Sequence, residues 1–130
     1  FHSIAHCVFS NRLLGQKCLN LKKVRKNGLK FSIGTDGLSS NISLNLWDEL
    51  RANLLAHPKI ELNKLAKMLL IAATKDGANA LNLDAGEIKV GKIADIGVFD
   101  SLDVKNPSQL ALQLILHTKK AQITFIGGQI

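Results

Sequence analysis

The segment that decides the fold reads Leu29-Lys30-Phe31-Ser32-Ile33-Gly34-Thr35-Asp36-Gly37. Its first five residues predict a short strand, and the two glycines that follow let the backbone turn sharply where the strand ends. Upstream, residues 1–9 predict another strand, and residues 17–26 predict a helix that ends at Asn27-Gly28. Strand, helix and strand together have the size of a parallel βαβ unit, which is about thirty residues.

The rest of the chain changes character near Asp84. Before it, apolar side chains recur at helical spacing and predict three helices, over residues 45–56 (capped by Ser43 or Asn45), 62–74 and 78–81. After it, alternating patterns predict short strands over residues 87–90, 94–99 and 121–126, the last followed by a Gly127-Gly128 hairpin turn. A helix near residues 107–117 is also expected, because Pro107 suits a first helical turn.

Composition excludes several classes of protein. The 130 residues, 46% hydrophobic and 21% charged, suit one globular region rather than a disordered or fibrous chain. No apolar run approaches the ~20 residues of a membrane-spanning helix, so no membrane partner is expected. No signal peptide is recognisable, and Cys7 and Cys18 are too few for a disulfide framework. These features predict a cytoplasmic protein with reduced thiols.

The net charge of +7 comes mainly from a basic cluster in the first quarter of the chain. Its members are Lys17, Lys22, Lys23, Arg25, Lys26 and Lys30. Such a cluster can bind nucleic-acid phosphates, but leucines and a valine interrupt it, as in an amphipathic helix. The chain also has no Tyr for base stacking. We therefore expect a solvated helix face and no nucleic-acid partner.

Asp36 is the candidate reactive residue. It directly follows a predicted strand of a parallel unit, and reactive groups of parallel α/β barrels lie on the loops at the carboxyl ends of the strands. The same Gly-Thr-Asp-Gly sequence is also typical of an Asx turn, in which the aspartate side chain caps its own backbone. The motif alone leaves both interpretations open.

Three segments resemble motifs of the amidohydrolase superfamily. Residues 4–11 resemble its HCPxSN loop, residues 32–41 its GTDGxxSN segment, and residues 87–100 its G.i.vGk.ADlvvfD segment. Their order matches that of the superfamily. Together they resemble the branch of metal-dependent deaminases and chlorohydrolases that includes methylthioadenosine/S-adenosylhomocysteine deaminase and aminodeoxyfutalosine deaminase.

The resemblance implies an α/β fold, namely the C-terminal part of a (β/α)8 TIM barrel with its last two strands and their helices in residues 1–83. Residues 84–130 would form part of a composite β domain. It further implies one divalent metal ion, zinc or iron, held by a His-x-His pair, a fifth-strand His and an eighth-strand Asp. Asp36 matches that Asp, which ligates the metal and accepts a proton from the attacking water before ammonia leaves a purine-like ring.

Other residues receive secondary roles from the resemblance. Ser40 and Asn41 match positions beside the metal, where they either contact substrate or brace the loop by local hydrogen bonds. Asn11 belongs to the first motif and is a candidate for substrate binding or support. His6 matches a seventh-strand His near the pocket mouth, with a structural or supporting role. Val8 stands where the family has Pro.

Residues outside the motifs have simpler expected roles. The remaining histidines, His2, His57 and His117, are predicted at the surface or at helix ends. Trp47 is predicted to pack in the core.

The ligands that the chain lacks limit its expected activity. It contains no His-x-His and no His-x-x-Glu, and one carboxylate cannot hold a catalytic metal. We therefore expect the C-terminal third of a longer enzyme, inactive alone and without bound metal. The fragment should self-associate through open strand edges, and the parent should be a homo-oligomer. Alternatives are a chlorohydrolase, a guanine deaminase, or a non-catalytic α/β assembly module.

Overall fold

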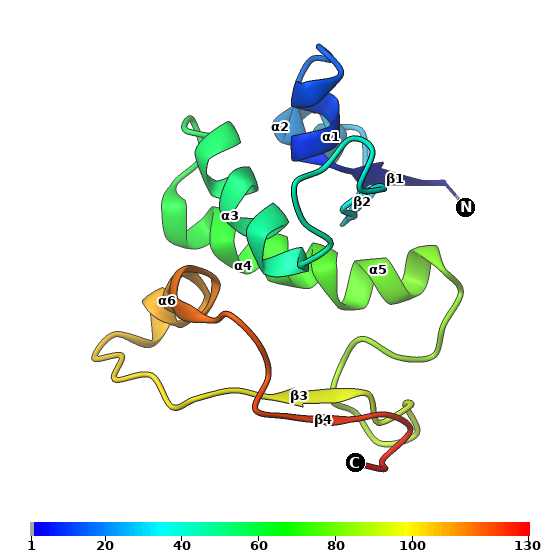
Figure 1. The fold of residues 1–130 in the computed structure, drawn as a ribbon, viewed down its shortest axis with the longest axis vertical. Helices are drawn as coiled ribbons and strands as arrows, with labels where there is room; N and C mark the ends of the chain where they lie inside the picture. Colours follow the sequence, from blue (N-terminus) through cyan, green and yellow to red (C-terminus); the bar gives the residue numbers. More distant parts are fainter. Residues whose placement is uncertain (1) are drawn as a thin grey trace.

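The computed structural model describes residues 2–130 and begins with a parallel strand pair (Figure 1). Strand β1 (Ser3–His6) pairs with β2 (Lys30–Ile33) in a register that runs from Ser3 opposite Lys30 to His6 opposite Ile33. The connection between them contains helices α1 (Val8–Leu13) and α2 (Leu21–Lys26). The predicted βαβ unit is therefore confirmed; its first residue, Phe1, lies outside the described residues.

The segment after β1 is helical, so the prediction that the strand continues to residue 9 was wrong. The strand ends at His6, and α1 begins at Val8. The backbone N–H groups of Val8 and Phe9 both donate to the carboxylate of Glu49, which lies on a later helix. These donors have no partner within their own helix, so a distant carboxylate stabilises the start of α1.

Helix α2 has the amphipathic character that the basic cluster predicted. It begins at Leu21 rather than Lys17, because the side chain of Asn20 accepts a hydrogen bond from the Lys23 N–H at 3.0 Å and so caps the helix. Leu21 and Val24 are buried, and the cations between them face solvent. Gly28 follows with φ +66°, a left-handed conformation that suits glycine after a helix end.

Three helices form the middle of the molecule: α3 (Leu46–Ala56), α4 (Leu62–Ala73) and α5 (Lys75–Ala80). Asn45 caps α3 by accepting the Trp47 N–H. Helix α4 contacts α3, α5 and β2, and its Leu65 and Leu69 are fully buried. Helix α5 starts three residues before its predicted start, because the Ala78 N–H bonds to the Thr74 carbonyl at 2.8 Å.

Residues 84–130 contain a second strand pair and one further helix. Strand β3 (Ile96–Val98) pairs antiparallel with β4 (Ile123–Phe125), at the opposite end of the molecule from β1 and β2 (Figure 1). Between them, the 3-10 helix η1 (Pro107–Gln109) continues into α6 (Leu110–His117). Helix α6 packs on α3 and α4, so the core of residues 1–83 extends to this helix.

The predicted strand over residues 87–90 is absent from the structure, which has turns and irregular backbone there. Gly86 and Gly91 both adopt left-handed conformations, with φ +83° and φ +88°. The Ile93 N–H bonds to the Asp84 carbonyl at 2.8 Å and closes the segment into a loop. Residues 87–90 alternate as a strand would, but they lie in a loop that is bent at Gly86 and Gly91.

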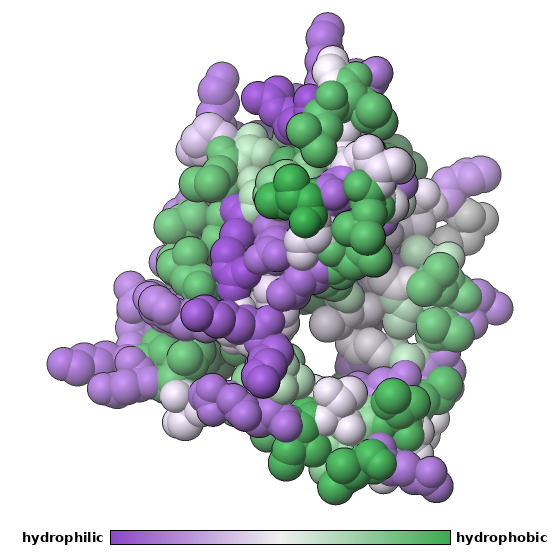
Figure 2. Space-filling model, viewed as in Figure 1, coloured by the Kyte–Doolittle hydropathy of each residue, from purple (hydrophilic) through white to green (hydrophobic). Residues whose placement is uncertain are grey.

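Many large apolar side chains remain at the surface. Figure 2 shows hydrophobic side chains gathered at the end of the molecule where β3 and β4 lie. The most exposed apolar residues are Leu55, Ile88, Val90, Ile126 and Ile130. Among residues 2–130, no helix combines the length and apolar character needed to cross a bilayer. Exposed apolar side chains of this kind favour association between copies of the chain. Self-association stays a prediction.

Candidate functional site

Asp36 occupies the turn that follows the carboxyl end of β2. Its own backbone is left-handed, with φ 60°, whereas neither Gly34 nor Gly37 has a positive φ. The prediction that the two glycines supply the turn was therefore wrong. Gly34 instead leaves room for Cys7, whose sulfur would lie 3.2 Å from an added Cβ. A left-handed non-glycine residue is uncommon, and such conformations concentrate at functional sites.

Two serine hydroxyls and one backbone amide hold the exposed Asp36 carboxylate. Ser10 Oγ donates to Oδ2 at 2.6 Å and Ser40 Oγ to the same oxygen at 3.2 Å, while the Gly37 N–H donates to Oδ1 at 2.9 Å. The Ser10 hydroxyl first, then the Gly37 amide and the Ser40 hydroxyl, hold the pKa of Asp36 below its usual value. The carboxylate is therefore anionic and fixed in one orientation at neutral pH.

Asn41 and Glu49 brace the loop that carries Asp36. The Asn41 side-chain amide donates to the Thr35 carbonyl at 2.6 Å and to Glu49 Oε2 at 3.1 Å, while its Oδ1 accepts the Ser43 N–H. Glu49 is 1% exposed, and burial raises the pKa of its carboxyl group. Through Glu49 the loop is tied to the start of α1, the helix that carries Ser10.

The structure places two residues at the site that the sequence did not single out. Ser10 contacts Asp36, whereas no hydrogen bond joins the side chain of Asn11, the next residue of α1, to the described residues of this cluster. The role of Asn11 in substrate binding or support stays a prediction. Ser10 and Glu49 were missed as site residues. Ser10 could have been found because it stands beside Asn11 in the same motif. Glu49 could not, because its burial depends on contacts that only the tertiary fold brings together.

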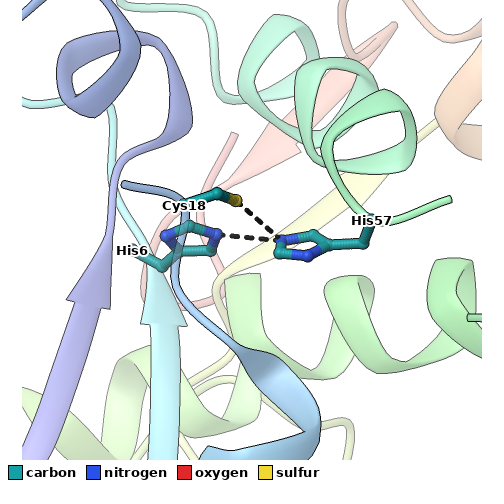
Figure 3. Close-up of side chains that lie close together, drawn as sticks. All are labelled: His6, Cys18 and His57. Atoms are coloured by element: carbon teal, nitrogen blue, oxygen red, sulfur yellow. Dashed lines mark hydrogen bonds between the residues drawn. The ribbon is translucent and has the colours of Figure 1, made fainter. Parts of the chain in front are cut away.

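The His6 side chain lies against those of His57 and Cys18 (Figure 3). The Nε2 atoms of His6 and His57 lie 3.1 Å apart, and Cys18 Sγ lies 3.7 Å from His57 Nε2. We call these three residues the His6–Cys18–His57 cluster. His57 ends α3 as predicted, but it is 8% exposed and therefore not a surface residue. Trp47 packs against the core and stacks edge-on against Phe99, as expected for a core residue.

Burial keeps both imidazoles of this cluster neutral. Burial first, and the neighbouring His57 second, lower the pKa of His6 to about 4 from its usual 6.5. Burial also lowers the pKa of His57 and raises that of the Cys18 thiol. In this environment the uncharged form of each group is favoured.

The low pKa of His6 predicts that the chain loses stability in mild acid. The unfolded chain protonates His6 near pH 6.5 and the folded chain only near pH 4, so the unfolded state binds more protons between these values. Acidification from pH 7 to pH 5 should lower the free energy of unfolding by about 1–2 kcal/mol through this residue. Urea titrations at both pH values measure this loss, at one low protein concentration.

The matched variants for this prediction are His6→Gln and His2→Gln. His6→Gln removes one titrating ring and should reduce the difference in unfolding free energy between pH 7 and pH 5, and the buried His57 should account for part of what remains. His2 is exposed, so His2→Gln should leave this difference unchanged. An undiminished acid loss in His6→Gln would show that His6 is not its source.

A profile of the amidohydrolase family matches residues 2–130. The chain is 49% identical over 123 residues to an adenosine deaminase of Helicobacter pylori, covering 95% of this chain and 30% of the relative. It is 46% identical over 127 residues to an aminodeoxyfutalosine deaminase of Nitratiruptor, covering 97% of this chain and 31% of that protein. The chain thus spans about a third of the length of these relatives.

Solved structures show the same fold. The crystal structure of Helicobacter pylori aminofutalosine deaminase in complex with methylthio-coformycin superposes with a TM-score of 0.91 at 50% identity, covering 96% of this chain and 30% of that one. An adenosine deaminase from Xanthomonas campestris with bound zinc superposes with a TM-score of 0.78 at 28% sequence identity. The match covers 98% of this chain and 31% of that one. These neighbours are TIM-barrel deaminases, so the chain is a mixed α/β part of such a fold.

Proposed function

The chain belongs to the amidohydrolase family, and from this premise we propose that it is part of a metal-dependent enzyme that deaminates an adenosine-type nucleoside. The longer polypeptide that would contain it is called the full-length protein below. Residues 1–83 would supply the end of the barrel, and residues 84–130 part of a composite β domain. The relatives with 46–49% identity are deaminases of this kind, which favours deamination over chlorohydrolase or guanine deaminase activity.

The observation that carries the proposal is the fixed, anionic carboxylate of Asp36 at the carboxyl end of β2. Ser10, Ser40 and Gly37 hold it by hydrogen bonds and leave it exposed on the side where further ligands could approach. A carboxylate in this state fits one position of a zinc or iron site. Among residues 2–130, no group of three potential ligands includes Asp36, so the remaining ligands would come from the rest of the full-length protein.

The residues of this chain would then act as follows. When bound, the divalent ion would lower the pKa of water and so supply a nucleophile at neutral pH. Asp36 would hold one ligand position and accept a proton at its carboxylate. Ser10 and Ser40 would keep Oδ2 oriented, and Asn41 would hold the Thr35 carbonyl and with it the turn. Ser40 and Asn41 thereby act as positioning residues, and Asn11 lies nearby on α1 as a candidate substrate contact.

Deamination by the zinc-loaded full-length protein tests this proposal. Adenosine and 5′-deoxyadenosine should release ammonia, because relatives 49% and 38% identical to this chain are named as deaminases of these two nucleosides. Guanine and a chlorotriazine should be turned over far more slowly, and the 130-residue chain alone should release none. Equal or faster turnover of guanine or the chlorotriazine would replace the proposal by one of the alternatives, and a full-length protein inactive on all four would point to a non-catalytic module.

A further inference from the structure

The His6–Cys18–His57 cluster brings together three metal-ligating side chains from segments that are far apart in the sequence. His6 ends β1, Cys18 precedes α2, and His57 follows α3. Their ligating atoms all lie within 4.8 Å of one another. Both histidines are buried, at 1% and 8% exposed, and the cysteine is half-buried (Figure 3).

Hydrogen bonding alone satisfies this cluster poorly. His57 Nε2 faces both His6 Nε2 at 3.1 Å and Cys18 Sγ at 3.7 Å. A ring nitrogen of a neutral imidazole carries either one hydrogen or one lone pair, so it cannot form a well-directed bond to both neighbours. Two neighbours therefore compete for one position on His57 Nε2, whereas a cation could accept lone pairs from all three ligating atoms at once.

The two separations measured from His57 match those of a zinc site, and all three ligating atoms lie within 4.8 Å of one another. Zinc–nitrogen bonds of about 2.0–2.1 Å and zinc–sulfur bonds of about 2.3 Å, at tetrahedral angles, place two nitrogens about 3.3 Å apart and nitrogen and sulfur about 3.6 Å apart. The observed distances are 3.1 Å and 3.7 Å. Small adjustments of side-chain rotamers would therefore complete the geometry.

We propose that His6, Cys18 and His57 bind one zinc ion, at a site separate from Asp36. Two imidazoles and a thiolate form a donor set typical of zinc and of other borderline divalent metals. The fourth position would open into a surface pocket that Cys18, His57, Lys22 and Lys59 help to line, which gives the ion an entry path. The ion would link β1, the segment before α2 and the end of α3.

The electrostatic environment fits neutral histidines and a thiol that loses its proton when the metal binds. Both rings hold their uncharged form at neutral pH, which is the form that binds metal. Burial raises the pKa of the Cys18 thiol, so the thiol would release its proton on metal binding, and the positive charge of Arg12 offsets part of this rise. The two lysines of the pocket favour water in its hydroxide form, or another anion, as the fourth ligand.

Cobalt substitution of the full-length protein tests the proposal. After chelation, Co²⁺ should produce a near-ultraviolet thiolate-to-cobalt charge-transfer band. Cys18→Ser should abolish the band, whereas Cys7→Ser, the matched change at the other free cysteine, should retain it. Asp36→Asn should retain it as well, because Asp36 is not part of this cluster. Circular dichroism of each variant confirms that it folds.

Zinc binding gives a second, independent measurement. A competition assay with a chromophoric chelator should find one zinc fewer per chain in Cys18→Ser, and His57→Asn should weaken that zinc by more than about 100-fold. Zinc should raise the thermal midpoint of the wild-type protein more than that of Cys18→Ser. Absence of the cobalt band from the wild type, or its survival in Cys18→Ser, would overturn the proposal.

Discussion

Asp36→Asn should lower kcat of the full-length protein by about 10³-fold or more, because it removes both a proton acceptor and an anionic metal ligand. The amide is nearly the same size, and its single oxygen can still accept from the Gly37 N–H, while the Ser10 hydroxyl can rotate to accept from the new NH₂ group. Steady-state ammonia release measures the loss, and metal analysis of the purified variant measures the accompanying drop in bound zinc or iron.

Asp103→Asn is the matched control for this substitution. Asp103 is exposed on a loop far along the chain from Asp36, so the same chemical change there should leave kcat and metal content unchanged. If Asp36→Asn kept full turnover and metal content, Asp36 would be an Asx-turn residue, and the alternative interpretation of its motif would be correct.

Glu49→Gln should produce the largest loss of stability at the site. Glu49 accepts the N–H groups of Val8 and Phe9 on one oxygen and the Asn41 amide on the other. Glutamine would place an NH₂ group against one of these donors, and Asn41 cannot turn over without losing its bonds to Thr35 and Ser43. A buried donor left unpaired costs about 1–3 kcal/mol. Denaturant titration of the full-length protein measures this.

The same exchange at Glu87 serves as the control for Glu49→Gln. Glu87 pairs with Lys75 at 2.7 Å on the surface, where ion pairs contribute about 0–1 kcal/mol. Glu87→Gln should therefore change stability little. Equal losses in the two variants would mean that the buried acceptor role of Glu49 is unimportant. Glu49→Gln should also reduce activity more than Glu87→Gln, because it loosens Asn41.

The local signals in the sequence predicted much of the fold. Several features follow from residues close to them in the sequence. They are strand β2, the end of α2 at Gly28, the cap of α3 by Asn45 and the helix start at Pro107. The errors came from distant partners. Helix α1 depends on Glu49, about forty residues later, and the segment over residues 87–90 forms a loop rather than pairing with another strand. No local pattern contains that information.

The candidate site was predictable to a similar extent. Asp36 could be singled out because it follows a strand between two glycines, although its left-handed backbone could not be foreseen. Ser10 and Asn11 are adjacent in the sequence, and only the helical geometry of α1 decides which of them meets Asp36. The His6–Cys18–His57 cluster joins residues 51 positions apart at its ends, so its spacing resembles no local metal motif.

Anomalous diffraction at the zinc edge, from crystals of the zinc-loaded full-length protein, tests the assignment of Asp36 most directly. We expect an anomalous peak about 2.0–2.2 Å from a carboxylate oxygen of Asp36. Zinc peaks that all lie beyond contact with Asp36, whose carboxylate then bonds only to Ser10, Ser40 and Gly37, would contradict the role proposed for this residue; a peak at the His6–Cys18–His57 cluster is judged separately.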